Sequence, residues 1–429
     1  RVGQQGPLPD SPAARSNGSF AGWPVLEDLE GVGAEEEVAI KIRNRFLVAR
    51  LLRGLLEDHL VVDEDSLSHQ VRGVLKEIAH EGQGSGEARV WQRILAAVQK
   101  REYVELVAAI LEWGRMVDAE GHFNGALEIL ELAFELARTS GASEAAADAA
   151  RFQGKVYRSR AQWDHALFWY GVARRISEES GNRKRLAMVL DGLGNAYRDL
   201  GNLPRARETL LEVLEIGRRT GDRSVLAVGH HDLMTVEKLR GNLVEAIHQG
   251  WLAVQAYDSR DGRLRALFDL ASTLREGGEL SAARDAYGLV AEQVKGMEAR
   301  ILALDALAFL AALRGDGEEH ATLRERMDAE GWETVSPVYR GQILYYRGLS
   351  HRALGQEAVA RLWLERALAY AGDHDLNKLI FDAEAALAED RPGRPEELVP
   401  AGYEDLVPEE ILGVRRGLRA MKEAPAGLG

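Results

Sequence analysis

Residues 193–201 have the sequence Leu193-Gly194-Asn195-Ala196-Tyr197-Arg198-Asp199-Leu200-Gly201, and this stretch decides the fold. It is followed by Ala206 and Leu210 at helical spacing, and the segment ends at Gly221-Asp222. Apolar residues three to four positions apart indicate amphipathic helices, and a glycine such as Gly201 supplies the left-handed backbone that ends a helix. We therefore predict two helices joined by a tight turn at Gly201.

The same pattern recurs along the chain with a period of about 40 residues, in seven copies over residues 105–372. Small residues recur in the first helix (Gly154, Gly348) and in the second (Ala166, Ala360), so the two backbones of a pair can approach closely. Glycines recur where first helices must end, at Gly201, Gly241, Gly278 and Gly355. No pair buries its apolar face alone, so we predict that the pairs stack into one array.

The segment Leu193–Gly201 resembles the first helix of the tetratricopeptide repeat family, in its longer-period form of about 40 residues. The resemblance covers residues 105–372 and implies an all-α fold, a right-handed superhelical solenoid of antiparallel helix pairs. Met234, Glu237 and Gly250 depart from the family's usual small or aromatic residues. The family pattern is specific to the fold and not to one function.

The flanks of the array have a different composition. We expect residues 1–33, rich in Gly, Pro and Ser, to be a disordered lead-in. We expect residues 34–104 to form an N-terminal helical unit or cap, with helices over 34–59, after Ser66 and from about Ala88. A helix-turn-helix DNA reader fits this region poorly because it is not basic, and residues 82–86 lack the Lys-Ser/Thr of a phosphate loop.

Residues 373–429 are expected to hold a C-terminal capping helix and a Pro-rich tail. A helix is predicted over residues 408–420, with an apolar side formed by Ile411, Leu412, Val414 and Leu418. Two interpretations are open for it. It caps the last repeat, or it is a detachable helix that occupies its own groove or that of a neighbouring molecule.

The composition excludes several classes of protein. Hydrophobic residues make up 46% and charged residues 28%, which is typical of a folded chain. The absence of cysteine excludes disulfides and thiol chemistry, and no apolar run is long enough to span a bilayer. The first residues lack a secretory h-region, so we expect a cytoplasmic protein. The prevalence of Arg over Lys and the abundant Ala are associated with GC-rich bacterial genomes. The chain begins with Arg1, so we expect its natural start to lie upstream.

The net charge of −14, from 68 acidic and 54 basic residues, argues against nucleic acid and anionic membranes as partners. No sequence motif supports catalysis. The His230-His231 pair is the one adjacent pair among the 11 histidines, and neighbours on a helix diverge too far to chelate one metal. Zinc, nucleophile-elbow, phosphate-loop and dinucleotide motifs are absent. We predict no enzyme, no catalytic residue, no metal and no cofactor.

The resemblance implies that first helices line a concave groove, and that their exposed side chains meet a ligand. These predicted partner-binding residues are Arg151, Lys155, Arg158, Asn195, Arg198, His231, Lys238, Arg265, Arg275 and Arg352. Because the guanidinium group of Arg can donate two parallel hydrogen bonds to a carboxylate, such a row predicts a protein or peptide partner with an acidic segment. The resemblance also implies that the amide of Asn195 holds a ligand backbone.

The acidic residues of the same helices leave another interpretation open. Asp148, Asp191, Asp199 and Glu237 also lie on first helices, so the cations can instead pair within a helix or between repeats. Three functional hypotheses therefore remain. The first is an interaction scaffold that captures a partner peptide, the second a ligand-responsive bacterial regulatory switch, and the third a self-assembling structural subunit.

Overall fold

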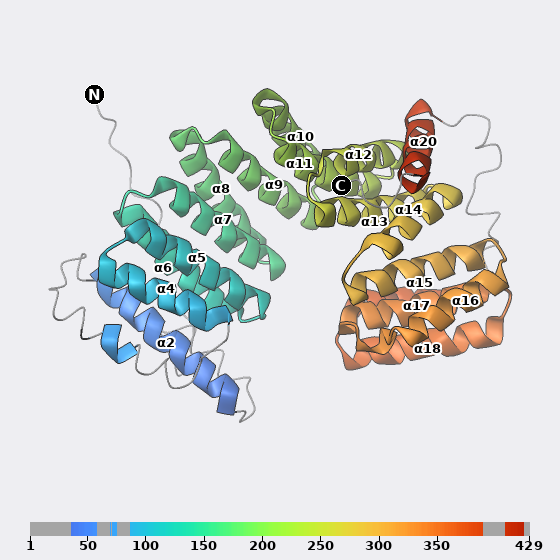
Figure 1. The fold of residues 1–429 in the computed structure, drawn as a ribbon, viewed down its shortest axis with the longest axis horizontal. Helices are drawn as coiled ribbons and strands as arrows, with labels where there is room; N and C mark the ends of the chain where they lie inside the picture. Colours follow the sequence, from blue (N-terminus) through green and yellow to red (C-terminus); the bar gives the residue numbers. More distant parts are fainter. Residues whose placement is uncertain (1–35, 58–68, 70, 75–85, 389–407, 424–429) are drawn as a thin grey trace. The chain divides into compact units, whose positions relative to one another are not determined.

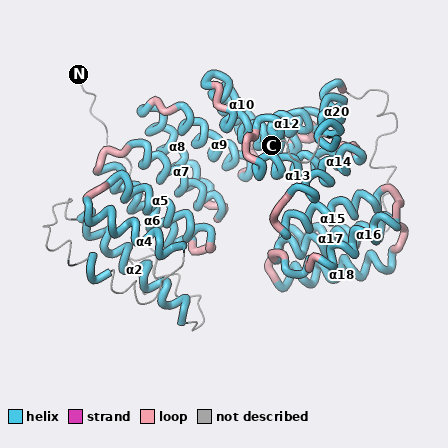
Figure 2. Tube along the Cα trace, in the orientation of Figure 1, coloured by secondary structure: helices cyan, strands magenta, loops and turns pink. Residues whose placement is uncertain are grey.

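The structure is a computed structural model that describes residues 36–57, 69, 71–74, 86–388 and 408–423. Every regular element in these residues is a helix, which confirms the predicted all-α repeat fold (Figures 1 and 2). The predicted lead-in lies outside the described residues. Of the helix expected after Ser66, residues 69 and 71–74 are described and helical, and Val71 and Val74 are buried as predicted. The chain divides into two compact units, residues 1–200 (unit 1) and 201–429 (unit 2), and each is described by itself.

Unit 1 is an array of consecutive antiparallel helices. They are α2 (Glu36–Glu57), α4 (Gly86–Lys100), α5 (Tyr103–Ala119), α6 (Phe123–Thr139), α7 (Ser143–Ser159), α8 (Trp163–Ser180) and α9 (Arg183–Asp199). From α4 onward each helix packs on the next, and α5 also packs on α7 and α7 on α9. We call α5, α7 and α9 the first helices of unit 1. Alternate helices thus share one face, as the repeat pattern predicts.

A buried ion pair joins the N-terminal helices of unit 1. The guanidinium group of Arg45 on α2 donates from Nε to Oε1 of Glu87 on α4 over 2.8 Å, and both side chains are almost fully buried. The indole Nε1 of Trp113 on α5 donates to the same carboxylate over 2.7 Å. Burying a charge is tolerable only when it is paired and hydrogen-bonded, so this contact fixes how α2, α4 and α5 pack.

Unit 2 continues the alternation of helices. It contains α10 (Leu203–Thr220), α11 (Arg223–Leu239), α12 (Leu243–Ala256), α13 (Arg260–Glu276), α14 (Leu280–Gln293), α15 (Met297–Leu313), α16 (Gly317–Ala329), the short 3-10 helix η1 (Trp332–Thr334), α17 (Pro337–Ala353), α18 (Glu357–Asp373), α19 (Asn377–Ala388) and α20 (Glu409–Glu423). We call α11, α13, α15 and α17 its first helices. None of the described helices combines the length and apolar character required to cross a bilayer.

The predicted turns and close contacts are present. Gly241 and Gly278 have positive φ angles of 80° and 79°, so they end their first helices in the left-handed conformation. A Cβ placed on Gly348 would lie 2.7 Å from Leu364 and 3.2 Å from the carbonyl oxygen of Ala360. The small residues predicted to face each other in this pair therefore do so, and α17 and α18 are in close contact.

The C-terminal helix is present but docks elsewhere than on the last repeat. Helix α20 covers the predicted residues 408–420 almost completely, yet it packs against α12 and α14. The last pair, α17 and α18, is covered by α19, a helix that the repeat pattern did not predict. The interpretation of α20 as a cap on the last repeat is therefore wrong, because α19 already buries that end.

Candidate functional site

The side chain of Tyr170 on α8 lies at the centre of a polar cluster in unit 1. Its ring is 1% exposed and is held between α7 and α9. A Cβ on Gly154 of α7 would lie 3.0 Å from the ring, and one on Gly192 of α9 would lie 2.5 Å from it. Only glycine allows these approaches, so the two first helices hold the ring in one place.

Charged side chains surround the Tyr170 hydroxyl. Burial is the main cause that raises its pKa to about 12, while the positive charges of Arg158 and Arg151 act in the opposite direction. The nearby carboxylates of Asp191 and Asp199 add a smaller rise. The hydroxyl therefore stays protonated at neutral pH and serves as a neutral hydrogen-bonding group among charges.

Two arginines beside this tyrosine are incompletely satisfied. The buried Nε of Arg151 and the buried Nη1 of Arg158 have no hydrogen-bond partner. The nearest acidic oxygens are 3.8 Å from Arg151, on Asp148, and 3.5 Å from Arg158, on Asp199, which is too far for a good hydrogen bond. Burial lowers the pKa of Arg151, which reflects the cost of desolvating its charge. Both guanidinium groups keep donor capacity.

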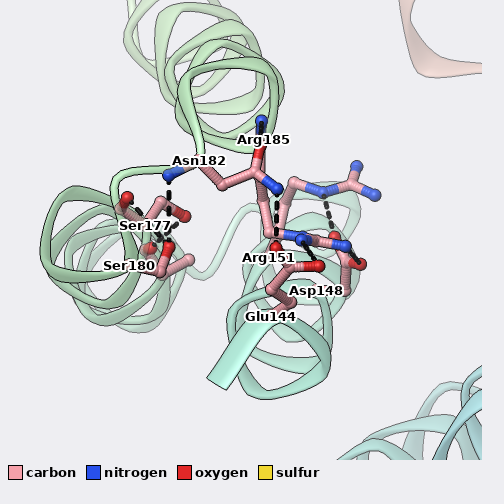
Figure 3. Close-up of polar contacts among 8 residues, drawn as sticks. Glu144, Asp148, Arg151, Ser177, Ser180, Asn182 and Arg185 are labelled. Carbon is pink, nitrogen blue, oxygen red and sulfur yellow. Dashed lines mark hydrogen bonds and ion pairs between the residues drawn. The ribbon is translucent and has the colours of Figure 1, made fainter. Parts of the chain in front are cut away.

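Figure 3 shows Asp148 between Arg151 and Arg185. Arg185, at the start of α9, donates to Asp148 over 2.9 Å and pairs with Glu144 over 2.8 Å, so both acids of α7 are already bound. Asn182 accepts from the backbone N–H of Arg185 over 3.0 Å and donates to Glu144 over 2.8 Å. These hydrogen bonds lower the pKa of Glu144 and fix α9 against α7.

The remaining predicted residues of unit 1 have partners within the protein. Lys155 pairs with Asp118 of α5 over 2.8 Å, and Arg198 donates twice to Asp199, at 2.9 and 2.7 Å. Arg158 and Arg198 thus share one carboxylate. Asn195 is 9% exposed, and its amide donates to the carbonyl of Asp191 over 3.1 Å. Its role in holding a ligand backbone remains a prediction.

Arg115 and Phe152 belong to the same surface but were not singled out from the sequence. The guanidinium group of Arg151 lies 4.2 Å above the Phe152 ring, and that of Arg115 on α5 lies 5.0 Å from it. Cation–π contact favours both placements. Arg115 lies nearly one repeat before Arg151 in the sequence, and this spacing is the signal from which its place on the same surface could have been predicted. We call Arg115, Arg151, Phe152, Arg158 and Tyr170 the unit-1 site.

In unit 2 the predicted cations bridge successive first helices. His231 on α11 contacts Asp269 on α13 through Nε2 over 2.8 Å and the Tyr257 hydroxyl through Nδ1 over 3.3 Å. Lys238 pairs with Glu276 over 2.7 Å and donates to Ser272 over 3.3 Å. These contacts link residues one repeat apart, so they hold α11 to α13.

Arg275 and Arg352 are also engaged inside unit 2. Arg275 lies 5.4 Å from the Phe309 ring and 5.5 Å from the Tyr346 ring, with Glu276 at 3.8 Å. Arg352 is 8% exposed and donates to the carbonyl of Ala386 on α19 over 2.7 Å. The expectation that Arg352 is exposed is wrong, because α19 ends against it. Arg265 is exposed on α13.

A cavity of about 720 Å³ in unit 2 was not anticipated from the sequence. Its wall contains Arg347 stacked on Trp332 and Trp363, at 4.5 and 5.1 Å, and Arg340 over Tyr370 at 5.4 Å. Asp328, Glu333 and Asp373 also line it. The cavity has as many arginines as acids, so its charges balance, but the buried Nε atoms of Arg340 and Arg347 have no hydrogen-bond partner.

In the part of the chain that the structure describes, no group of three His, Asp or Glu side chains is placed for a metal ion. No family model matches the chain, and no curated protein matches it. A similar solved structure is that of a Rap protein complexed with competence and sporulation factor. It is 12% identical, with a TM-score of 0.45, and the match covers 77% of this chain and 99% of that one. The described part of the chain is an all-α array in which consecutive helices pack on one another.

Proposed function

We propose that the protein is a non-catalytic binding protein, and that its unit-1 site captures an acidic segment of a partner. The observation that carries this proposal is the pair of incompletely satisfied guanidinium groups, those of Arg151 and Arg158, beside the Tyr170 hydroxyl. A ligand carboxylate supplies the acceptors that Asp148 and Asp199 do not. Catalytic residues and cofactors have no part in this function.

Physical chemistry favours a carboxylate at this place. A buried donor without a partner costs about 1–3 kcal/mol, whereas a hydrogen bond to a charged group contributes about 1.5–3 kcal/mol. When Arg151 or Arg158 turns toward a ligand, it loses no hydrogen bond at its unpartnered nitrogen. The planar guanidinium group can then bind a carboxylate in a bidentate manner, and the Phe152 ring holds Arg151 in a defined plane.

The net charge of the chain shapes how such a ligand binds. At −14 the protein repels an acidic partner at long range, so attraction is confined to short distances. We therefore expect modest association rates that rise with added salt. Binding specificity then comes from the position of carboxylates relative to Arg151 and Arg158 and not from bulk charge.

Peptide titration tests this function. A short fluorescein-labelled peptide of alternating Glu and Ala is titrated by anisotropy, with the matching Gln–Ala peptide as the control ligand. Arg151→Gln with Arg158→Gln should weaken binding of the Glu peptide by at least about 10-fold. Lys238→Gln, whose amine is engaged with Glu276 in unit 2, is the matched protein control and should change little. Equal affinity in wild type and the double variant contradicts the proposal.

A ligand-responsive switch is the second candidate function, and the position of the site favours it. Asp199, which Arg158 and Arg198 share, directly precedes the division between the two compact units at residue 200. A ligand that draws Arg158 away from Asp199 changes the last turn of α9. If the protein is a switch, small-angle scattering will show a changed radius of gyration when the Glu peptide saturates it, and a pure scaffold will show none.

A further inference from the structure

Helix α20 packs against α12 and α14, the second helices of two pairs in unit 2. In the chain, α15 to α19 lie between α14 and α20. Ile411, Val414 and Leu418 are completely buried against α12 and α14. Figure 1 shows α20 beside these two helices, after the chain has completed α15 to α19. Among the described elements, its substantial contacts are with α12 and α14 alone. An apolar surface on the array therefore exists for a single amphipathic helix.

The surface under α20 has a buried acidic centre. Glu279, at the start of α14, is 4% exposed, and its carboxylate accepts two hydrogen bonds from Arg415, from Nε and Nη2 at 2.7 Å each. Nearer the edge, Lys422 donates to Asp285 over 2.6 Å. A buried carboxylate needs a partner, so an occupant of this surface must bring a basic residue at the position of Arg415.

The fit also requires a small residue in the occupant. A Cβ on Gly417 would lie 2.1 Å from Cζ2 of the Trp251 ring on α12, so the helix backbone rests directly on the indole. At Gly413, about one turn earlier in α20, a Cβ would have no neighbour within 4 Å. The surface thus recognises apolar residues at i, i+3 and i+7, a basic residue at i+4 and glycine at i+6, counted from Ile411.

We propose that the α12–α14 surface is a binding site for a basic amphipathic helix of a partner protein, which displaces α20. A helix of this length is marginal by itself in water, so α20 depends on docking for its order. The buried side chains of α20 pack in one apolar cluster with residues of α12 and α14, so the surface that α20 covers is apolar and favours an amphipathic helix as its occupant. Docking of an amphipathic helix in an apolar groove is a recurrent mode of recognition.

The tether decides between a partner helix and a second copy of this chain. An attached helix is present at an effective concentration in the millimolar range. An identical α20 from another molecule therefore competes poorly at ordinary concentrations. A partner helix that keeps the equivalents of Arg415, Gly417 and Lys422 and makes further contacts with α12 and α14 can displace it. This surface and the unit-1 site require ligand charges of opposite sign.

The test keeps the chain at full length and releases α20 by one substitution. Gly417→Leu prevents docking because the new side chain meets Trp251, and Gly413→Leu is the matched control with open space at its Cβ. The probe is a fluorescein-labelled peptide of residues 409–423, measured by anisotropy. The Gly417→Leu chain should bind it at least about 100-fold more tightly than wild type or Gly413→Leu, since it lacks the tethered competitor.

Charge reversal tests the specificity of the same surface. In the Gly417→Leu chain, Glu279→Lys should abolish binding of the peptide, and a peptide carrying Arg415→Glu should restore it. The proposal is overturned if the charge reversals at Glu279 and Arg415 leave the peptide affinity unchanged, or if all chains bind the peptide equally. So does unfolding of the Gly417→Leu chain in circular dichroism, which would make α20 part of the core.

Light scattering identifies the occupant. The proposal requires that wild type and the Gly417→Leu chain are both monomeric, which excludes a second copy as the occupant. A wild-type dimer that Gly417→Leu dissociates assigns the surface to a second copy and overturns the proposal. None of these outcomes involves Arg151 or Arg158. Failure here therefore leaves the acidic-segment function to its own test.

Discussion

The first-helix faces of the two units carry similar side chains but use them differently. In unit 1, Arg151 and Arg158 retain nitrogens without a hydrogen-bond partner. In unit 2, His231 and Lys238 reach acids of the next first helix at 2.8 and 2.7 Å, and Arg275 lies between aromatic rings. A row of cations in a repeat protein therefore indicates a binding site only where neighbouring repeats do not already satisfy it.

The difference has a local cause. In unit 2 the acids Asp269 and Glu276 each lie one repeat beyond the side chain that contacts them, His231 at 2.8 Å and Lys238 at 2.7 Å. In unit 1 the acid nearest Arg151 is Asp148, which Arg185 has already bound at 2.9 Å. Asp148 thus lies between two arginines, with Oδ2 bound by Arg185 and Oδ1 3.8 Å from Nε of Arg151.

The largest test of the comparison removes a buried acid from unit 2. Asp305 on α15 pairs with Arg324 on α16, and both side chains are at most 10% exposed. Asp305→Ala leaves the guanidinium group buried and unpaired, which we expect to cost about 3–5 kcal/mol of unfolding free energy. Urea unfolding followed by circular dichroism measures it.

The control for this prediction is Arg158→Gln in unit 1. Its ion pair is long and partly exposed, so its loss should cost less than about 1 kcal/mol. Comparable losses for Asp305→Ala and Arg158→Gln would show that the two units do not differ in the structural use of their charges.

The second test uses pH on Glu237 of α11. Burial alone would raise its pKa, but hydrogen bonds from Asn242 and Arg207 and the charge of Arg240 outweigh it, so the pKa lies below its ordinary value of 4.5. A lowered carboxyl pKa stabilises the fold above pH 4.5, and this stability is lost as the pH falls through the folded pKa. Glu237→Gln should therefore cost about 1.5–3 kcal/mol at pH 7 and much less at low pH.

Denaturant titrations at several pH values measure the difference in unfolding free energy between wild type and Glu237→Gln, which should shrink as the pH falls. Glu144→Gln in unit 1 is the comparison, since Asn182 and Arg185 also lower the pKa of Glu144, but on an exposed surface. We expect the same sign and a smaller change. A Glu237→Gln penalty that stays constant from pH 7 to pH 3 would contradict the assignment.

The third test concerns the glycine that holds Tyr170 in the unit-1 site. Gly192→Ala places a methyl group 2.5 Å from the ring and should cost about 1–3 kcal/mol by overpacking, as well as weakening the Glu peptide. Gly171→Ala on α8 is the matched control, with no neighbour within 4 Å, and should be neutral or stabilising by up to about 1 kcal/mol. Thermal unfolding distinguishes the two, and equal melting temperatures would show that the ring is not tightly held.

Sequence pattern was a good guide to the helices and a partial guide to the site. Glycines such as Gly241 and Gly278 mark helix ends because a left-handed residue is a local requirement, visible in one chain. The cations were assigned to first helices correctly. Whether each one is satisfied depends on side chains one repeat away, and sequence spacing does not specify that geometry.

The wrong predictions for Arg352 and α20 also arise from contacts that sequence spacing does not specify. Arg352 was taken as a groove residue because it stands at a first-helix position, but α19, which the repeat pattern did not predict, buries it. Helix α20 was placed on the last repeat because it follows that repeat in the chain. Its docking on α12 and α14 is set by the Arg415–Glu279 pair and by the Gly417 contact with Trp251, which are long-range contacts.

The smallest test sharpens the comparison at two matched lysines. Lys155 pairs with Asp118 across first helices of unit 1, and Lys238 pairs with Glu276 across those of unit 2, at 2.8 and 2.7 Å. The Lys155 side chain is 50% exposed and that of Lys238 is 26% exposed, so water and salt screen the first pair more. We expect Lys155→Gln to cost at most about 0.5 kcal/mol and Lys238→Gln up to about 1 kcal/mol, the first effect vanishing in molar salt. If Lys155→Gln proves the more costly, unit 1 relies on its charges for stability as much as unit 2 does. Among the residues predicted to line the groove, the donors of Arg151 and Arg158 would then be the remaining difference.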